Sequence, residues 1–105
     1  MSKIPENIKE SIIKYINYLE NSKIHVLQAI LYGSYAEGNY NEFSDIDLAL
    51  VSESFSGTKF FDIDMLRDAK FAINTDISPM PYRPEDFTPD DLFAREILKN
   101  GIRIV

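Results

Sequence analysis

The amino-acid sequence predicts an α/β protein in which a small mixed β-sheet is flanked by helices. Segments whose apolar residues recur at helical spacing alternate along the chain with shorter apolar runs of strand length. The 105 residues suit one domain spanning 1–105, and the 45% hydrophobic content can supply one core. The expected order is helix, strand, turn, strand, helix, strand, helix, strand.

The first part of the chain predicts a helix followed by a strand. The helix is expected over 5–21, where Pro5 suits a first helical turn. Its buried face is marked by apolar residues at helical spacing, namely Ile8, Ile12, Tyr15, Ile16 and Leu19. The near-continuous apolar run 24–32 then predicts a strand. His25 lies at the end of this strand far from the glycine that follows it, and we expect a structural or surface histidine.

A longer helix is expected in the middle of the chain, over 58–73, after a serine-rich loop at 52–57. Its apolar surface is assigned to Phe60, Phe61, Ile63, Leu66, Ala69 and Ile73. Asp62 and Asp64 form an acidic pair two residues apart. Side chains at that spacing point in different directions on a helix, so we interpret both as surface charges and not as a metal site.

A short strand is expected at 75–78, ended by Pro79 and Pro81. By itself, Asp76 in this segment is typical of an ordinary acid at a strand edge.

The end of the chain predicts one more helix. Thr88 is expected as its N-cap and Pro89 as its first residue, with Asp91 at the spacing of a capping box. The buried face is assigned to Leu92, Phe93, Ile97 and Leu98. Gly101 is a natural stop for the helix, and 102–105 can add an edge strand.

Two carboxylates stand at the start of a buried strand, in the sequence Asp45-Ile46-Asp47 followed by Leu-Ala-Leu-Val. Side chains two apart on a strand project from the same face, with α-carbons about 7 Å apart. Two carboxylates held this close repel each other, and a hard cation such as Mg²⁺ between them relieves the repulsion. The alternative is a solvated strand start without a metal.

A glycine–serine turn, Gly33-Ser34, follows the preceding apolar run. A strand that ends in this way before a helical turn presents free backbone N–H groups and a hydroxyl, which can bind a phosphate. The alternative is a tight bend in which Ser34 caps the helical turn. A phosphate site and a Mg²⁺ site so close in sequence are more specific together than either is alone.

These residues carry a resemblance to a known family. The signature GSxxxGxxxxxSDxD of the DNA polymerase beta-like nucleotidyltransferase superfamily is matched by Gly33, Ser34, Gly38, Ser44, Asp45 and Asp47. The chain resembles the minimal nucleotidyltransferases (MNT proteins), which often act as antitoxins beside HEPN-domain toxins. It departs from many members at Glu37, where they carry arginine.

The resemblance implies a role for each residue of the motif. Gly33, Ser34, Gly38 and Ser44 would bind the nucleotide. Asp45 and Asp47 would be metal ligands and catalytic residues, and the family has a third acid on a neighbouring strand. Asp76 would supply it, as a ligand and as the group that helps to deprotonate the acceptor hydroxyl. Two Mg²⁺ ions are expected.

The implied reaction is transfer of a nucleotidyl group, with AMP from ATP to a hydroxyl of a HEPN toxin as the leading interpretation. Two alternatives remain open. One is an antitoxin that masks its partner without catalysis, and the other is transfer to a small molecule.

The composition of the chain argues against several classes of protein. The net charge of −6 argues against direct binding of nucleic acid, because a polyanion is bound through clusters of Lys and Arg. The absence of cysteine fits a cytoplasmic protein. No apolar stretch is long enough to cross a membrane, and no signal-peptide pattern is present.

Overall fold

The computed structural model describes residues 4–105, apart from the side chain of Lys59. Four helices and four strands follow one another in the order α1 (Glu6–Asn21), β1 (Gln28–Tyr32), α2 (Ser34–Glu37), β2 (Ile46–Val51), α3 (Lys59–Ile73), β3 (Ile77–Tyr82), α4 (Leu92–Asn100) and β4 (Ile102–Arg103). The strands form one sheet in the order β3-β2-β1-β4. β1 is antiparallel to both β2 and β4, whereas β2 and β3 are parallel. The predicted mixed sheet is therefore confirmed.

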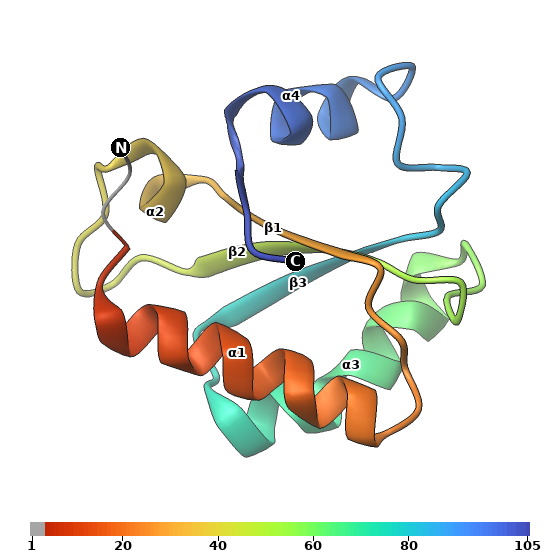
Figure 1. The fold of residues 1–105 in the computed structure, drawn as a ribbon, viewed down its shortest axis with the longest axis horizontal. Helices are drawn as coiled ribbons and strands as arrows, with labels where there is room; N and C mark the ends of the chain where they lie inside the picture. Colours follow the sequence, from red (N-terminus) through yellow and green to blue (C-terminus); the bar gives the residue numbers. More distant parts are fainter. Residues whose placement is uncertain (1–3) are drawn as a thin grey trace.

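Helices cover both faces of the sheet. Figure 1 shows α1 and α3 on one face and α4 on the other. Under α1 and α3, the core includes Ile12 and Leu19 with Leu48 and Leu50 of β2. Under α4, a second cluster contains Ile30, Ala49, Val51, Tyr82, Phe87, Ala94 and Ile97. Successive residues of β2 thus alternate between two apolar layers, which explains why this strand reads as a continuous apolar run.

Helix α1 closely follows the prediction. All five residues of the predicted face are buried, and Pro5 occupies the N-cap position.

Strand β1 is shorter than the apolar run 24–32 suggests, because it begins at Gln28. Ile24 and Val26 are buried, but they belong to the connection from α1. Their backbone N–H groups donate to Leu19 O and to a Glu20 carboxylate oxygen, at 2.9 and 2.8 Å. His25 is exposed beside the same carboxylate, as expected for a surface histidine.

Strand β3 corrects the prediction for its region, since it runs through both Pro79 and Pro81 instead of ending before them. β3 is an edge strand, and the carbonyls of Asp76 and Tyr82 accept hydrogen bonds from the β2 side. The prolines fall at the alternate positions, so their nitrogens face away from β2. An edge strand tolerates proline there because no hydrogen bond of the ladder is lost.

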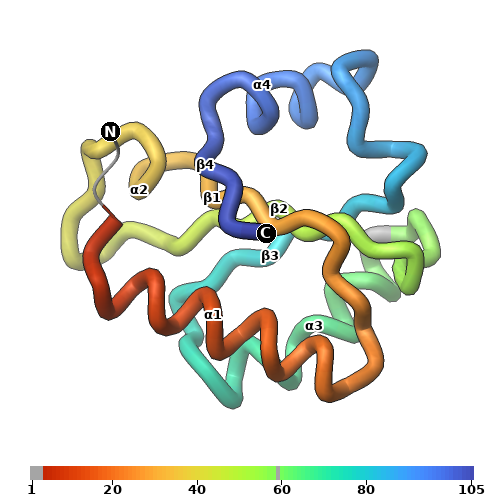
Figure 2. Tube along the Cα trace, in the orientation of Figure 1, coloured from red at the N-terminus to blue at the C-terminus, as the bar shows by residue number. Residues whose placement is uncertain are grey.

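Helix α4 also begins later than predicted. Its N-cap is Asp91 and not Thr88, because the Asp91 carboxylate accepts hydrogen bonds from the N–H groups of Phe93 and Ala94. Ala94 and Ile97 form its buried face, whereas Leu92, Phe93 and Leu98 are exposed. Of the four residues predicted for this face, Ile97 is buried and the other three are exposed. The edge strand after Gly101 is confirmed, and Figure 2 shows β4 beside β1.

The prediction that Asp62 is a surface charge is wrong. Asp62 is only 1% exposed, and its carboxylate accepts hydrogen bonds from the N–H groups of Ser56 and Gly57 and from the Ser56 hydroxyl. Asp64 is exposed and pairs with Arg67, as a surface charge does. Three residues assigned to the apolar surface of α3 are exposed and not part of its buried face, namely Phe60, Phe61 and Ile63.

Among residues 4–105, no helix has the length and apolar character needed to span a membrane.

Candidate functional site

The glycine–serine turn joins β1 to the short helix α2. Gly33 has a φ of 74° and serves as the N-cap of α2, so Ser34 is the first helical residue and not the cap. The Gly33 carbonyl accepts the N–H groups of Ala36 and Glu37. The N–H groups of Ser34 and Tyr35 come earlier in the helix and have no carbonyl partner within it. The turn therefore presents two backbone donors and a hydroxyl, a set suited to an anion.

Gly33 also lies directly against Asp47. Tyr32, the residue before the glycine, is paired with Asp47 across β1 and β2. A Cβ atom added at Gly33 would overlap the Asp47 carboxylate. Glycine is thus required twice at this position, by the left-handed backbone and by the close approach of the acid. The anion-binding turn and the acidic strand start adjoin each other.

The two strand-start acids project from the same face of the sheet. Asp45 comes immediately before β2 and Asp47 is its second residue. Ile46 and Leu48 point into the core under α1 and α3, so the alternation of side chains directs Asp45 and Asp47 to the α4 face. Burial and then the charge of Asp45 raise the pKa of Asp47. Such a pair has the excess negative charge and the oxygen donors that fit a hard cation such as Mg²⁺.

Asp76 lies at the same end of the sheet, in the turn before β3. Its carbonyl accepts the Ile46 N–H at 2.9 Å, and the parallel register pairs Ile46 with Ile77. Asp45 and Asp76 immediately precede these two paired residues, so both acids enter at the same end of the parallel strands. Burial, followed by the charge of Asp76, raises the pKa of Tyr35 on α2. The sequence-predicted acids therefore gather at one edge from two neighbouring strands.

The gathering does not amount to a preformed three-ligand site. Within residues 4–105, no group of three or more His, Cys, Asp or Glu side chains is arranged to hold a metal ion. The adjacent pair Asp45 and Asp47 is the part of the arrangement that fits a cation, and the role of Asp76 as a third ligand stays a prediction.

Gly38 and Ser44 shape the loop between α2 and β2. Gly38 ends α2 with a φ of 85°, and the space where its Cβ would stand is open. The Ser44 hydroxyl accepts the Asn41 N–H at 2.9 Å, which folds the loop back on itself. Tyr35 and Tyr40 stack with ring centroids 4.6 Å apart and hold the loop against α2. The nucleotide-binding role of Gly38 and Ser44 stays a prediction.

A pocket of about 170 Å³ opens beside the turn. Its lining consists of Tyr32, Gly33, Glu37, Phe93, Glu96, Ile97 and Asn100. Phe93 meets Tyr32 edge-to-face, at 5.7 Å between ring centroids. The α4 residues of this pocket were not predicted as site residues. No local signal marks them, because they reach Gly33 only through the packing of α4 on β1.

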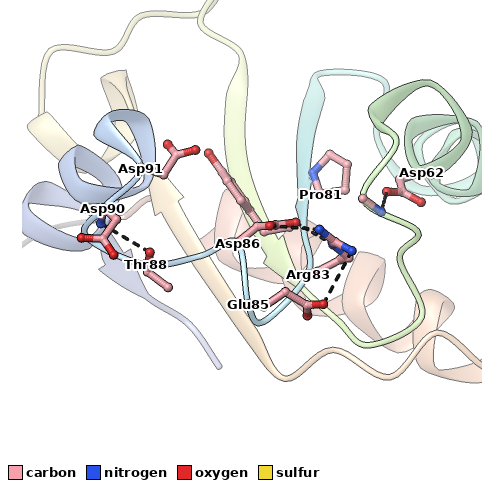
Figure 3. A pocket seen from close by; sticks show the side chains of 10 residues that line it. Asp62, Pro81, Arg83, Glu85, Asp86, Thr88, Asp90 and Asp91 are labelled. Carbon is pink, nitrogen blue, oxygen red and sulfur yellow. Dashed lines mark hydrogen bonds and ion pairs between the residues drawn. The ribbon is translucent and has the colours of Figure 1, made fainter.

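A larger pocket of about 490 Å³ lies at the opposite end of the parallel strands, near Tyr82 (Figure 3). Arg83 is held there by Asp86, with Nε 2.7 Å from a carboxylate oxygen, and by Glu85 at 3.6 Å. The hydrogen bond from Arg83 lowers the pKa of Asp86. This pocket contains none of the motif residues, so it is separate from the turn and the strand-start acids.

Two solved structures are similar to the chain in fold. A chain in the crystal structure of a toxin–antitoxin with AMP-PNP superposes with a TM-score of 0.63 at 18% identity, covering 92% of this chain and 72% of that one. A proposed nucleotidyltransferase from Sulfolobus solfataricus gives a TM-score of 0.60 at 18% identity, covering 98% and 89%. No curated protein sequence matches the chain.

The family described as "Polymerase beta, Nucleotidyltransferase" matches residues 10–105. The match runs from within α1 to the end of the chain, and it includes the glycine–serine turn and the acids that adjoin it. The chain therefore belongs to the polymerase beta nucleotidyltransferase family.

Proposed function

We propose that the chain is a Mg²⁺-dependent nucleotidyltransferase that moves AMP from ATP to a hydroxyl group of a partner protein. The observation that carries this proposal is the direct contact between the glycine–serine turn, which is suited to an anion, and the acid pair. In this contact Gly33 lies against Asp47. An anion site and a cation site that share a wall suit a metal-bound triphosphate.

Each residue has a role in this proposal. The N–H groups of the turn and the Ser34 hydroxyl hold the terminal phosphates, while Gly38 and Ser44 fix the loop beside them. Asp45 and Asp47 hold Mg²⁺, with two ions expected when Asp76 contributes. When bound, the metal offsets the negative charge that builds up on the phosphate oxygens.

The proposed reaction is an in-line displacement. The acceptor oxygen bonds to the α-phosphorus while the bond from that phosphorus to the bridging β-oxygen breaks, so pyrophosphate leaves. Asp76, in the turn before the neighbouring strand, takes the proton of the acceptor hydroxyl. Most of the rate gain would come from positioning, because the chain places the acids and the turn on one edge.

The partner in this proposal is a toxin of the HEPN class, with the chain acting as its antitoxin in the cytoplasm. Support comes from the fold shared with a chain of a toxin–antitoxin structure that contains AMP-PNP, an ATP analogue. A second candidate is a module that only masks its partner, which the exposed apolar side chains of α3 favour.

The two candidate functions differ in how much of the chain is needed to inactivate a given amount of toxin. Substoichiometric chain with ATP and Mg²⁺ should inactivate an excess of the toxin encoded by the neighbouring reading frame, and should raise the toxin's mass by one or more AMP units. Asp45→Asn combined with Asp47→Asn should abolish the mass change, whereas Glu53→Gln, at an exposed acid of the β2–α3 loop, should not. Stoichiometric protection without ATP and without a mass change would refute the enzyme and support the masking module.

A further inference from the structure

Helix α3 carries a stripe of exposed side chains along one flank. Phe60, Ile63, Arg67 and Phe71 recur at intervals of three or four residues, so they lie on one side of the helix. We call these four residues the α3 stripe. Phe60 is 78% exposed, Phe71 64% and Ile63 40%. Large apolar side chains gathered in this way on a surface mark an interaction site more often than isolated ones do.

A groove of about 110 Å³ runs between the stripe and the edge strand β3. It is lined by Ile63, Arg67, Lys70, Phe71 and Pro79. No carboxylate lines it, although the chain as a whole has a net charge of −6. Arg67 pairs with the neighbouring Asp64 at 2.8 Å, and Lys70 has no ion pair within residues 4–105. The groove is therefore apolar, and Lys70 is the cation at its rim that lacks a paired carboxylate within the described residues.

The edge of β3 next to the groove is poorly suited to pairing with another strand. The outward positions of β3 are Ile77, Pro79 and Pro81, and the two prolines have no N–H to donate. The Ile77 N–H already donates to Asn74 O at 3.1 Å. Binding through side chains is therefore favoured here, and an amphipathic helix laid along the stripe binds in this way with apolar residues every three or four positions.

We infer that the α3 stripe is the docking site for an amphipathic helix of a partner protein, with apolar side chains over the phenylalanines and a carboxylate opposite Lys70. The partner is the protein that the proposed function takes as acceptor, so the assignment rests on that proposal in this respect. The stripe lies on the α3 face of the sheet, whereas Asp47 projects from the α4 face. α3 ends at Ile73, three residues before Asp76, so a docked helix extends toward the acidic edge.

A second copy of the chain is the less favoured occupant. Two chains of net charge −6 repel each other, and a single cation at the groove, Lys70, offsets little of that repulsion.

The test measures binding of the purified product of the neighbouring reading frame by isothermal titration calorimetry. Phe60→Ser with Phe71→Ser should raise the dissociation constant about tenfold or more, as loss of aromatic anchors does. Leu92→Ser with Leu98→Ser is the matched control, since it removes apolar side chains that are 71% and 43% exposed on α4, and it should leave the constant unchanged. Lys70→Glu should weaken binding and reduce its sensitivity to salt.

Three results would overturn the assignment: equal dissociation constants for the phenylalanine variant and the wild type, no complex with that product, or a wild-type homodimer that the phenylalanine substitutions dissociate. Two further measurements separate it from the proposed chemistry. Asp47→Asn should bind the partner normally but transfer nothing. The phenylalanine variant should bind Mg-ATP normally but lose the partner. If the wild-type chain binds the partner but transfers no AMP to it, only the proposed function is refuted.

Discussion

At the scale of single residues, Gly33 is the position with the strictest requirements. Its φ of 74° disfavours side chains, and the Asp47 carboxylate occupies the space where a Cβ would stand. Gly38 shares the positive φ, but its surroundings are open. A substitution at Gly38 therefore introduces backbone strain alone, whereas a substitution at Gly33 introduces both backbone strain and steric overlap.

Gly33→Ala should consequently destabilise the fold more than Gly38→Ala does. The Gly38 substitution should cost about 1 kcal/mol for strain in the left-handed region. The Gly33 substitution adds the displacement of Asp47 and should cost about 1–3 kcal/mol more. Urea unfolding of both variants measures the difference, and equal losses would contradict the close contact between Gly33 and Asp47.

Asp62 supports a second prediction at the residue scale. Its buried carboxylate accepts three hydrogen bonds from Ser56 and Gly57, which would be left without a partner after Asp62→Ala. The expected loss is about 2–4 kcal/mol of unfolding free energy. Asp64→Ala, two residues away on the exposed side, should change stability by less than about 0.5–1 kcal/mol. Thermal unfolding compares them, and a similar small loss in both would mean that Asp62 is not a structural acceptor.

At the scale of elements, the caps and connections decide where helices and strands begin. The connection from α1 to β1 is secured by Glu20, whose carboxylate accepts the Val26 N–H at 2.8 Å and lies 3.2 Å from His25. These hydrogen bonds, first from Val26 and then from His25, lower the pKa of Glu20. The ionised carboxylate is therefore the form that the folded chain stabilises.

The sign of this pKa shift predicts a pH dependence. A group whose pKa is lower in the folded state stabilises the fold above its unfolded pKa, and loses this contribution as the pH falls through its folded pKa. Glu20→Gln should lower the melting temperature at pH 7, and its difference from the wild type should shrink as the pH falls below about 4. Melting curves from pH 7 to pH 3 test this. A difference that does not vary with pH would show that the Glu20 charge makes no contribution.

At the scale of the whole molecule, the candidate site is an edge to which distant segments contribute. The turn follows β1, the acid pair begins β2, Asp76 precedes β3, and α4 forms the wall of the pocket beside Gly33. The parallel pairing of β2 with β3 brings Asp76 to the edge, because both strands start there.

Asp76→Ala should for this reason separate chemistry from binding. With the turn and the acid pair intact, Mg-ATP affinity should be largely retained, while transfer should fall by about 10²-fold or more through loss of the proton acceptor. Calorimetry gives the affinity and mass spectrometry of the acceptor gives the rate. If Asp76→Ala transfers AMP at the wild-type rate, Asp76 is an ordinary acid at the strand edge and has no role in the reaction.

Features that depend on local chemistry could be predicted from the amino-acid sequence alone. The helical spacing of the apolar residues in α1 predicted all five of its buried residues, and Gly33-Ser34 predicted the turn after β1. The alternation along 45–51 placed Asp45 and Asp47 on one face, because strand geometry leaves no other arrangement.

Features that depend on a residue distant in the sequence became visible only in the folded chain. The apolar run at 24–32 became a strand only from Gln28, where β2 and β4 supply hydrogen bonds. Pro79 and Pro81 could remain inside β3 because β3 lies at the edge. Asp62 was buried and Asp64 exposed because the loop before α3 folds back over only one of them. Residue type and spacing are local properties, whereas burial and strand pairing are set by the neighbours that the fold brings together.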